Sequence, residues 1–211
     1  MFDGILRAIT RPGQFFQTLQ QDDGVAARAL LVVLLVAVLN TGVGYFSALP
    51  TARAFAGTLL GSVTPVTAPL TAALLSFLSW LVYGLLVRVA AGTTAKPWAI
   101  TAYAMSPQAI IYPLIIAAAL VFPVEVTPIA ADVTQLEAAQ EATLQVQREV
   151  QASTFGRASQ VLNLAAILWW LALIFVGVRA AAGVTRAFVS VALVAALSLG
   201  LVFVPLLLTP L

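Results

Sequence analysis

The chain has 211 residues, of which 62% are hydrophobic and 9% are charged, and its formal net charge is +2. Soluble domains carry about 25% charged residues, so this composition could not cover the surface of a water-soluble fold. Composition therefore predicts an integral membrane protein. The small positive charge comes from few charged residues and does not indicate a nucleic-acid partner.

Two missing residue types limit the available chemistry. The chain contains no cysteine and no histidine. This excludes disulfides, thiolate and imidazole metal ligands, and the Ser-His-Asp and Cys-His arrangements of nucleophilic catalysis. The phosphate-binding pattern G-x-x-x-x-G-K is also absent from the sequence. We therefore predict a protein that is not an enzyme, with no catalytic residue, no metal site and no cofactor.

Residues 1–25 form a segment polar enough to lie outside the bilayer. Its apolar residues recur at helical spacing, and Pro12 fits the first position of a second short helix. We expect a cytoplasmic, amphipathic segment. Two interpretations stay open: it packs on the bundle's own cytoplasmic face, or it contacts the membrane surface through Arg7, Arg11, Phe15 and Phe16.

Residues 26–211 are predicted to form an all-α polytopic bundle of five transmembrane helices, at about 26–49, 66–90, 98–122, 159–182 and 187–208. Each stretch approaches or exceeds the ~20 apolar residues that cross a bilayer. The alternative interpretation of the first stretch is a signal peptide cleaved near Ala54. Signal h-regions are only about 7–15 residues long, so a retained span is favoured. A loop rich in Pro, Thr and Gly is expected between the first two spans, to about Pro65.

The third span organises the chain, because it carries prolines and polar groups at membrane depth. An unpaired polar group in hydrocarbon costs several kcal/mol, so this span should face other helices. Ser106 followed by Pro107 fits an N-cap and a first helical position, which would split the span into two half-helices. The alternative is a plain proline kink. The predicted polar bundle or ligand site comprises Asn40, Tyr103, Ser106, Pro107, Gln108 and Tyr112.

An external helix is predicted at about 130–155, in a stretch rich in Ala, Gln and Glu. Its apolar stripe is weak, so it could pack over the bundle, pair with a second copy or stand in solvent. Glu137 and Glu141 share one face of this helix at i,i+4 spacing. Paired carboxylates on an exposed helix are usually only solvated charges.

Small residues recur on one face of the last span. Ala192, Ala196 and Gly200 are spaced four residues apart, which permits close approach of helix backbones. This face is expected to serve helix packing, either within the bundle or between subunits.

The distribution of basic residues predicts the orientation. With the N-terminus inside, seven basic residues are cytoplasmic and three are outside, in agreement with the positive-inside rule. We therefore expect an N-in, C-out chain with the external helix on the outer face. The cytoplasmic set is Arg7, Arg11, Arg28, Arg88, Lys96, Arg179 and Arg186, and the outer set is Arg53, Arg148 and Arg157.

Two stretches resemble a known family. RPGQFFQTL, from Arg11 to Leu19, is similar to the Pro-x-x-Phe-Phe-x-x-Leu pattern that precedes the first span of the Yip family of five-span membrane proteins. AYAMSPQAIIYPL, from Ala102 to Leu114, resembles the family's Tyr-x-x-x-Pro stretch at the third span. In layout the resemblance is to the prokaryotic branch and covers nearly the whole chain. The external helix looks like an addition to the family pattern.

The resemblance implies a multi-pass protein of a prokaryotic cytoplasmic membrane. Eukaryotic members look like trafficking factors that bind Ypt/Rab GTPases through a long cytosolic N-terminus. Here that segment is short and has no acidic docking stretch. A Rab-type GTPase is therefore not an expected partner.

Two functions remain as hypotheses. The first is a non-enzymatic, membrane-organising scaffold that forms a homo-oligomer and contacts membrane lipids. The alternative is a transporter, channel or lipid-moving protein that uses the proline-broken third span. Because no Asp, Glu, Lys or Arg lies deep in a predicted span, ion-coupled transport is the weaker hypothesis.

Overall fold

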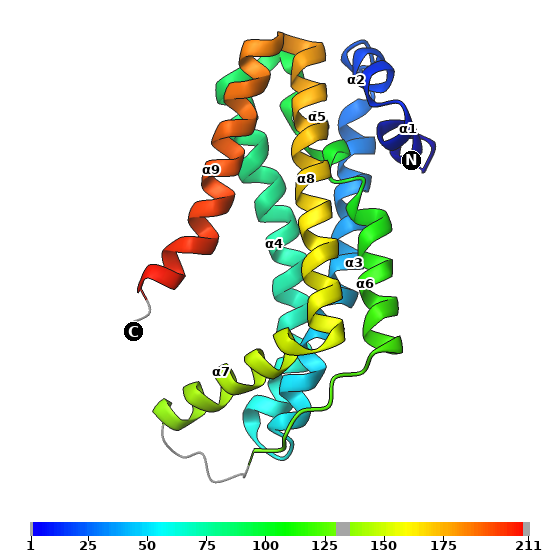
Figure 1. The fold of residues 1–211 in the computed structure, drawn as a ribbon. Coiled ribbons are helices and arrows are strands. Elements are labelled where there is room, and N and C mark those ends of the chain that lie inside the picture. Colours follow the sequence, from blue (N-terminus) through cyan, green and yellow to red (C-terminus); the bar gives the residue numbers. More distant parts are fainter. Residues whose placement is uncertain (1, 130–135, 209–211) are drawn as a thin grey trace. The chain divides into compact units, whose positions relative to one another are not determined.

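A computed structural model describes residues 2–129 and 136–208, with side chains described for residues 2–129 and 138–198. Every regular element in these ranges is a helix, which confirms the all-α prediction (Figure 1). The elements are α1 (Phe2–Thr10), α2 (Pro12–Gln20), α3 (Val25–Ala54), α4 (Leu59–Ala91), the 3₁₀ turn η1 (Thr93–Ala95), α5 (Pro97–Ala104), α6 (Gln108–Val121), α7 (Leu136–Ala152), α8 (Thr154–Ala182) and α9 (Val184–Leu208).

Four helical stretches are long and apolar enough to cross a membrane: Val25–Ala54, Leu59–Ala91, Pro97–Val121 and Thr154–Ala182. In α9 the apolar stretch Val184–Ser198 belongs to the shorter class. The long helices expose large apolar side chains, such as Leu70, Leu74 and Leu85 on α4. Hydrocarbon rather than water is the solvent in which such a surface is stable.

The loop expected between the first two spans is largely helical. α3 runs through Pro50 to Ala54, and α4 begins at Leu59 and contains Pro65 and Pro69. The hydroxyls of Thr64 and Thr67 donate to carbonyls one turn earlier, at 2.6 and 3.1 Å. Proline is better tolerated in membrane helices than in soluble ones, so a loop interpretation based on Pro and Gly content fails here.

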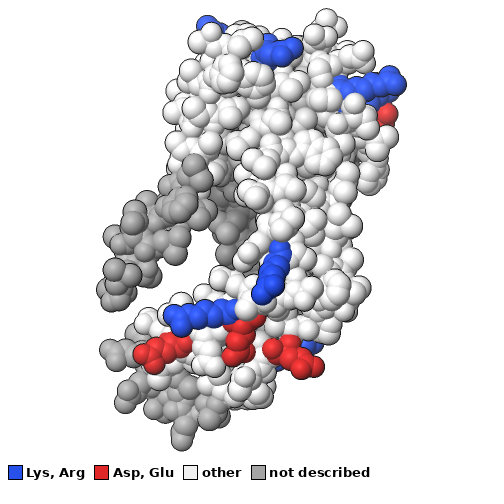
Figure 2. Space-filling view, viewed as in Figure 1, with Lys and Arg blue, Asp and Glu red and all other residues white. Residues whose placement is uncertain are grey.

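The chain divides into two compact units, each of which collects segments distant in sequence. The first unit comprises residues 1–34, 77–107 and 167–211, and the second comprises 35–76 and 108–166. All seven basic residues expected to be cytoplasmic belong to the first unit, and the three expected outside belong to the second. In the second unit, acidic side chains lie over α7 and its neighbourhood (Figure 2).

In the first unit, α2 is seated on the unit's core by Phe16, whose side chain is fully buried. Gly177 of α8 makes room for this ring. A Cβ at position 177 would lie 2.7 Å from Ile100 Cγ2 and 3.2 Å from Phe16 Cδ1. Three segments far apart in sequence therefore meet at one residue that has no side chain.

A second contact fixes the start of α5 within the same unit. The Trp80 indole N–H donates to the Trp98 carbonyl at 2.9 Å, and the two rings meet edge to face at 5.8 Å. The Trp98 ring lies directly against Gly84, where any side chain would overlap it. α4 and α5 are thus held together by one hydrogen bond and one close ring contact.

In the second unit, α7 docks on the end of α3. Buried Val146 packs against Ala54 and Phe55, and the Ile129 amide donates to the Ala54 carbonyl at 2.8 Å. Packing on the protein, one of the three arrangements left open by the sequence, is therefore present in this unit. Residues 130–135, the first part of the predicted external helix, lie outside the described residues.

The N-in, C-out orientation remains a prediction that single-cysteine labelling tests cleanly, since the native chain has no cysteine. Thr94→Cys, exposed in η1, should react with a membrane-impermeant maleimide only after the membrane is opened. Gln140→Cys, exposed on α7, should react in intact spheroplasts. The native chain serves as the unlabelled control, and the reverse pattern would overturn the orientation.

The close packing of Phe16 and Ile100 against Gly177 predicts contrasting effects of two glycine substitutions. Gly177→Ala forces Ile100 to shift, and overpacking of this kind costs about 1–3 kcal/mol, which exceeds the ~1 kcal/mol gained in helix propensity. Gly13→Ala on α2 meets nothing within 4 Å and should be neutral or stabilising. Thermal unfolding in detergent should show a lower midpoint for Gly177→Ala only; equal midpoints would contradict this packing.

Candidate functional site

The third span is split rather than kinked. α5 ends at Ala104 and α6 begins at Gln108, with a turn at residues 105–107 between them. Pro107 has no N–H and cannot continue the helical ladder toward the Tyr103 carbonyl. That carbonyl instead accepts a hydrogen bond from the Ser106 amide at 3.1 Å. The backbone therefore tightens into a turn at the Ser-Pro pair, for which the sequence left a break or a kink open.

Ser106 does not cap α6 as the sequence suggested. Its side chain is fully buried, and its Oγ has no hydrogen-bond partner among the described residues. The Oε1 of Gln108, at the start of α6, is likewise buried without a partner in the described part of the chain. A buried, unsatisfied polar atom costs about 1–3 kcal/mol. Nothing in the described residues compensates this cost for the two oxygens that flank the break in the third span.

The residues predicted to form one polar site lie in different surroundings. Tyr103, Ser106 and Pro107 belong to the first unit, and Asn40, Gln108 and Tyr112 to the second. The Asn40 amide donates to the Ala72 carbonyl at 2.9 Å and to Ser76 Oγ at 3.0 Å, so it joins α3 to α4.

The other tyrosine of the predicted set, Tyr112, is partly buried and packs against the apolar cluster around Ile111 and Ile115. Within the second unit, Asn40 and Tyr112 therefore make helix-packing contacts.

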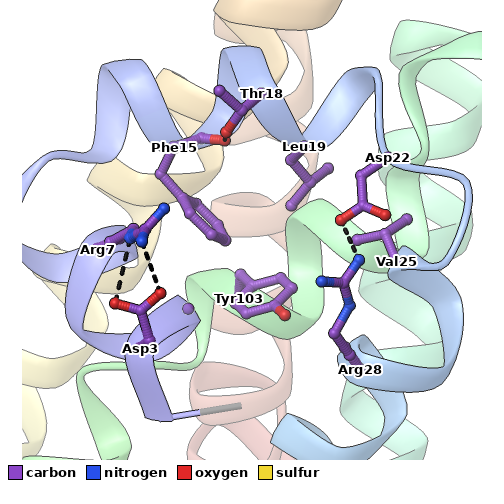
Figure 3. Close-up of a pocket in the computed structure, with 10 residues that line it drawn as sticks. Asp3, Arg7, Phe15, Thr18, Leu19, Asp22, Val25, Arg28 and Tyr103 are labelled. Carbon is purple, nitrogen blue, oxygen red and sulfur yellow. Dashed lines mark hydrogen bonds and ion pairs between the residues drawn. The ribbon is translucent and has the colours of Figure 1, made fainter.

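Tyr103 lines a cavity of about 310 Å³ within the first unit, which we call the N-terminal cavity (Figure 3). The lining combines the consecutive segments α1, α2 and the start of α3 with α5, which is distant in sequence. Its residues are Asp3, Gly4, Arg7, Phe15, Thr18, Leu19, Asp22, Val25, Arg28 and Tyr103.

Two aromatic rings form the middle of this cavity. The Phe15 and Tyr103 rings meet edge to face with centroids 4.8 Å apart. α1 can approach them closely because residue 4 is glycine: a Cβ there would lie 3.1 Å from Tyr103 Cε1. Phe15 was expected at the membrane surface and Tyr103 inside the bundle, and the fold brings the two together.

Two ion pairs flank the rings on opposite sides (Figure 3). The Arg7 Nε donates a hydrogen bond to Asp3 Oδ1 at 3.2 Å, and the two side chains form an ion pair at 2.9 Å. Arg28 forms an ion pair with Asp22. The Asp22 carboxylate also accepts a hydrogen bond from the Gly24 amide at 3.1 Å. The Asp3–Arg7 pair is visible in the sequence as an i,i+4 spacing, whereas nothing in the sequence relates Asp22 and Arg28 to Tyr103.

The lysine that precedes α5 fixes the corner between α2 and α3. The Lys96 ammonium donates to the Asp22 carbonyl at 2.9 Å, and the Gln20 side chain donates to the Ala95 carbonyl at 3.4 Å. Lys96 itself has a left-handed backbone with φ of 47°. The wall of the cavity that carries Asp22 is therefore tied to the turn before α5.

The predicted membrane-contact residues are redistributed by the fold. Arg7 and Arg11 are exposed, Phe15 is half-buried in the cavity wall, and Phe16 is reassigned to the packed interior. Phe2 and Leu6 of α1, which were not among the predicted contact residues, are exposed as well. They belong to the apolar residues that recur at helical spacing in this segment.

The predicted small-residue face of α9 is outward-facing where it is described. Ala192 and Ala196 are exposed, and the surroundings of Gly200 lie outside the described residues. Among the described residues, no group of three or more His, Cys, Asp or Glu side chains is placed to hold a metal ion.

Helices long and apolar enough to cross a membrane, with large apolar side chains exposed along them, define a multi-pass integral membrane protein. Residues 6–207 match the Yip1 domain, so the chain belongs to the Yip1 domain family and the resemblance noted in its sequence is confirmed. No curated protein and no solved structure matches the chain significantly.

Proposed function

We propose that this Yip1-domain protein is a non-enzymatic organiser of the membrane that it spans, acting through lipid contact at its N-terminal helices and through self-association. A prokaryotic cytoplasmic membrane is the proposed location. The observation that carries the proposal is the outward side of α1, where Phe2 is 70% exposed and Leu6 is 63% exposed. The lack of His and Cys supports a role without catalysis.

α1 has one side for the protein and another for its surroundings. Ile5 and Ala8 are buried where α1 packs against α2 and α5. Phe2 and Leu6 point away from that contact, and Arg7 is exposed on the same helix. Burying such side chains stabilises the bound state by about 1.5–3 kcal/mol each. Apolar residues beside a guanidinium are typical of a helix that lies in the membrane interface.

Self-association has a separate basis in α9. Ala192 and Ala196 are both exposed and lie one turn apart, so a second helix could approach this face closely. The proposed partners are thus membrane lipids and further copies of this chain. A Rab-type GTPase and nucleic acid remain unexpected partners.

Depth-dependent quenching tests the proposed lipid contact. The full chain carrying Phe2→Cys or Leu6→Cys, labelled with an environment-sensitive fluorophore and reconstituted in vesicles, should show blue-shifted emission that brominated acyl chains quench. Gln17→Cys, exposed on α2, is the matched control and should be quenched several-fold less. Water-like emission at positions 2 and 6, equal to that at position 17, would refute the lipid contact.

A second candidate function is movement of lipid or solute through the split third span. The buried, unpaired Ser106 Oγ and Gln108 Oε1 favour it, because polar groups at a helix break are used by transporters to meet polar ligands. The absence of charged residues deep in the predicted spans makes coupled ion transport the least supported form.

A lipid-movement assay separates the two functions. Vesicles with fluorescent lipid in both leaflets would be exposed to dithionite, which bleaches only the outer leaflet. If the split span moves lipid, the native chain should bleach well beyond half of the signal, and Ser106→Ala or Gln108→Leu should slow this at least several-fold. Asn163→Leu, exposed on α8, should not. Bleaching that stops near half with the native chain would exclude lipid movement.

A further inference from the structure

We propose that the N-terminal cavity binds a phosphoethanolamine group, a phosphate joined to a primary ammonium, through Arg28, Asp22 and Tyr103. The inference deepens the proposed lipid contact and rests on it, because α1 both lines the cavity and carries the outward Phe2 and Leu6. The cavity volume of about 310 Å³ is at the lower end for ligand sites, which suits a head group whose acyl chains remain outside.

The charges around the cavity favour a ligand that carries both signs. The lining has the guanidinium groups of Arg7 and Arg28 and the carboxylates of Asp3 and Asp22, so the formal charges cancel. An anion that displaced a carboxylate from its arginine would leave that carboxylate without its ion-pair partner. A zwitterion exchanges one ion pair for two, because its phosphate takes the guanidinium while its ammonium takes the carboxylate.

The Asp22–Arg28 pair is better placed for this exchange than the Asp3–Arg7 pair. Its side chains are 36% and 47% exposed, against 72% and 66% for Asp3 and Arg7. Less exposed charges are less screened by salt, so they attract a ligand more strongly. Asp22 also keeps its hydrogen bond from the Gly24 amide if Arg28 turns to a phosphate.

Tyr103 supplies a neutral donor beside this pair. In Figure 3 its hydroxyl points to the side of the cavity that holds Arg28. A hydroxyl there can donate to a phosphate oxygen while the guanidinium binds two others in a fork. Ring and hydroxyl together would place the phosphate between α5 and α3.

The site suits a primary ammonium better than a quaternary one. Carboxylate oxygens accept the three N–H bonds of a primary ammonium, whereas a quaternary ammonium has no N–H to donate. Quaternary groups are held by the faces of aromatic rings. Here the Phe15 and Tyr103 rings are engaged with each other edge to face.

Native mass spectrometry of the full chain in detergent would test the inference. Phosphatidylethanolamine, phosphatidylcholine and phosphatidylglycerol would be titrated separately. We expect one saturable molecule of the ethanolamine lipid, bound about tenfold more tightly than the other two. Arg28→Gln and Asp22→Asn should each abolish this preference, and Arg88→Gln, an exposed arginine outside the cavity, should preserve it. Equal binding of all three lipids, or preference for the anionic lipid, would overturn the proposal.

A gentler variant and a soluble competitor complete the design. Tyr103→Phe removes only the hydroxyl and should weaken the ethanolamine lipid several-fold with an unchanged thermal midpoint; native affinity would remove Tyr103 from the site. Displacement of the lipid by O-phosphoethanolamine would show that the soluble group is recognised by itself. Retained lipid selectivity without displacement would assign the site to the lipid. Either result supports the shared chemistry.

The outcomes also separate this inference from the proposed function. Quenching at positions 2 and 6 without ethanolamine selectivity would leave the lipid contact intact and refute only the head-group site. Selective binding without quenching would refute the lipid contact of α1 and leave the cavity as a ligand site.

Discussion

A peptide group in hydrocarbon has no water to bond, and this constraint governs most of the structure. It explains why the described elements are helices and why their bounds extend past the prolines of α3 and α4. It also explains why the helical ladder stops inside the third span. Pro107 cannot donate to the Tyr103 carbonyl, so the Ser106 amide does, and the third span becomes α5 and α6.

The break has consequences within the first unit. It ends α5 after eight residues, in which Tyr103 lines the N-terminal cavity and Ile100 packs against Gly177. The buried Phe16 ring also packs against Gly177 and so fixes α2 on α8. With α2 held, α1 can lie against α2 and α5 with Phe2 and Leu6 outward. The exposed apolar side of α1 and the charged cavity thus belong to one small helical assembly.

The sequence predicted well what depends on long runs and poorly what depends on distant partners. The family and the all-helical class are carried by apolar stretches and two short motifs. The polar set was less coherent, because polarity at membrane depth shows that a residue needs a partner without showing which one. The Asn40 amide donates to Ser76, and the Tyr103 ring packs edge to face against Phe15. The prediction of a loop at residues 50–65 was wrong, because rules drawn from soluble helices overstate how strongly proline breaks a helix in a membrane.

Composition and apolar runs by themselves determined a multi-pass helical membrane protein, and two short motifs indicated the Yip family. At Ser106-Pro107 the sequence predicted an interruption and left open whether it is a break or a kink. The spans and the interruption follow from transfer free energies and backbone hydrogen bonding, which act locally along the chain. Tertiary structure alone decided that Phe16 is buried, that Phe2 and Leu6 are exposed, and that Asp22 and Arg28 line one cavity with Tyr103. Such contacts join residues about 75 positions apart, as the Gln20–Ala95 hydrogen bond does, and close packing rather than local preference selects them.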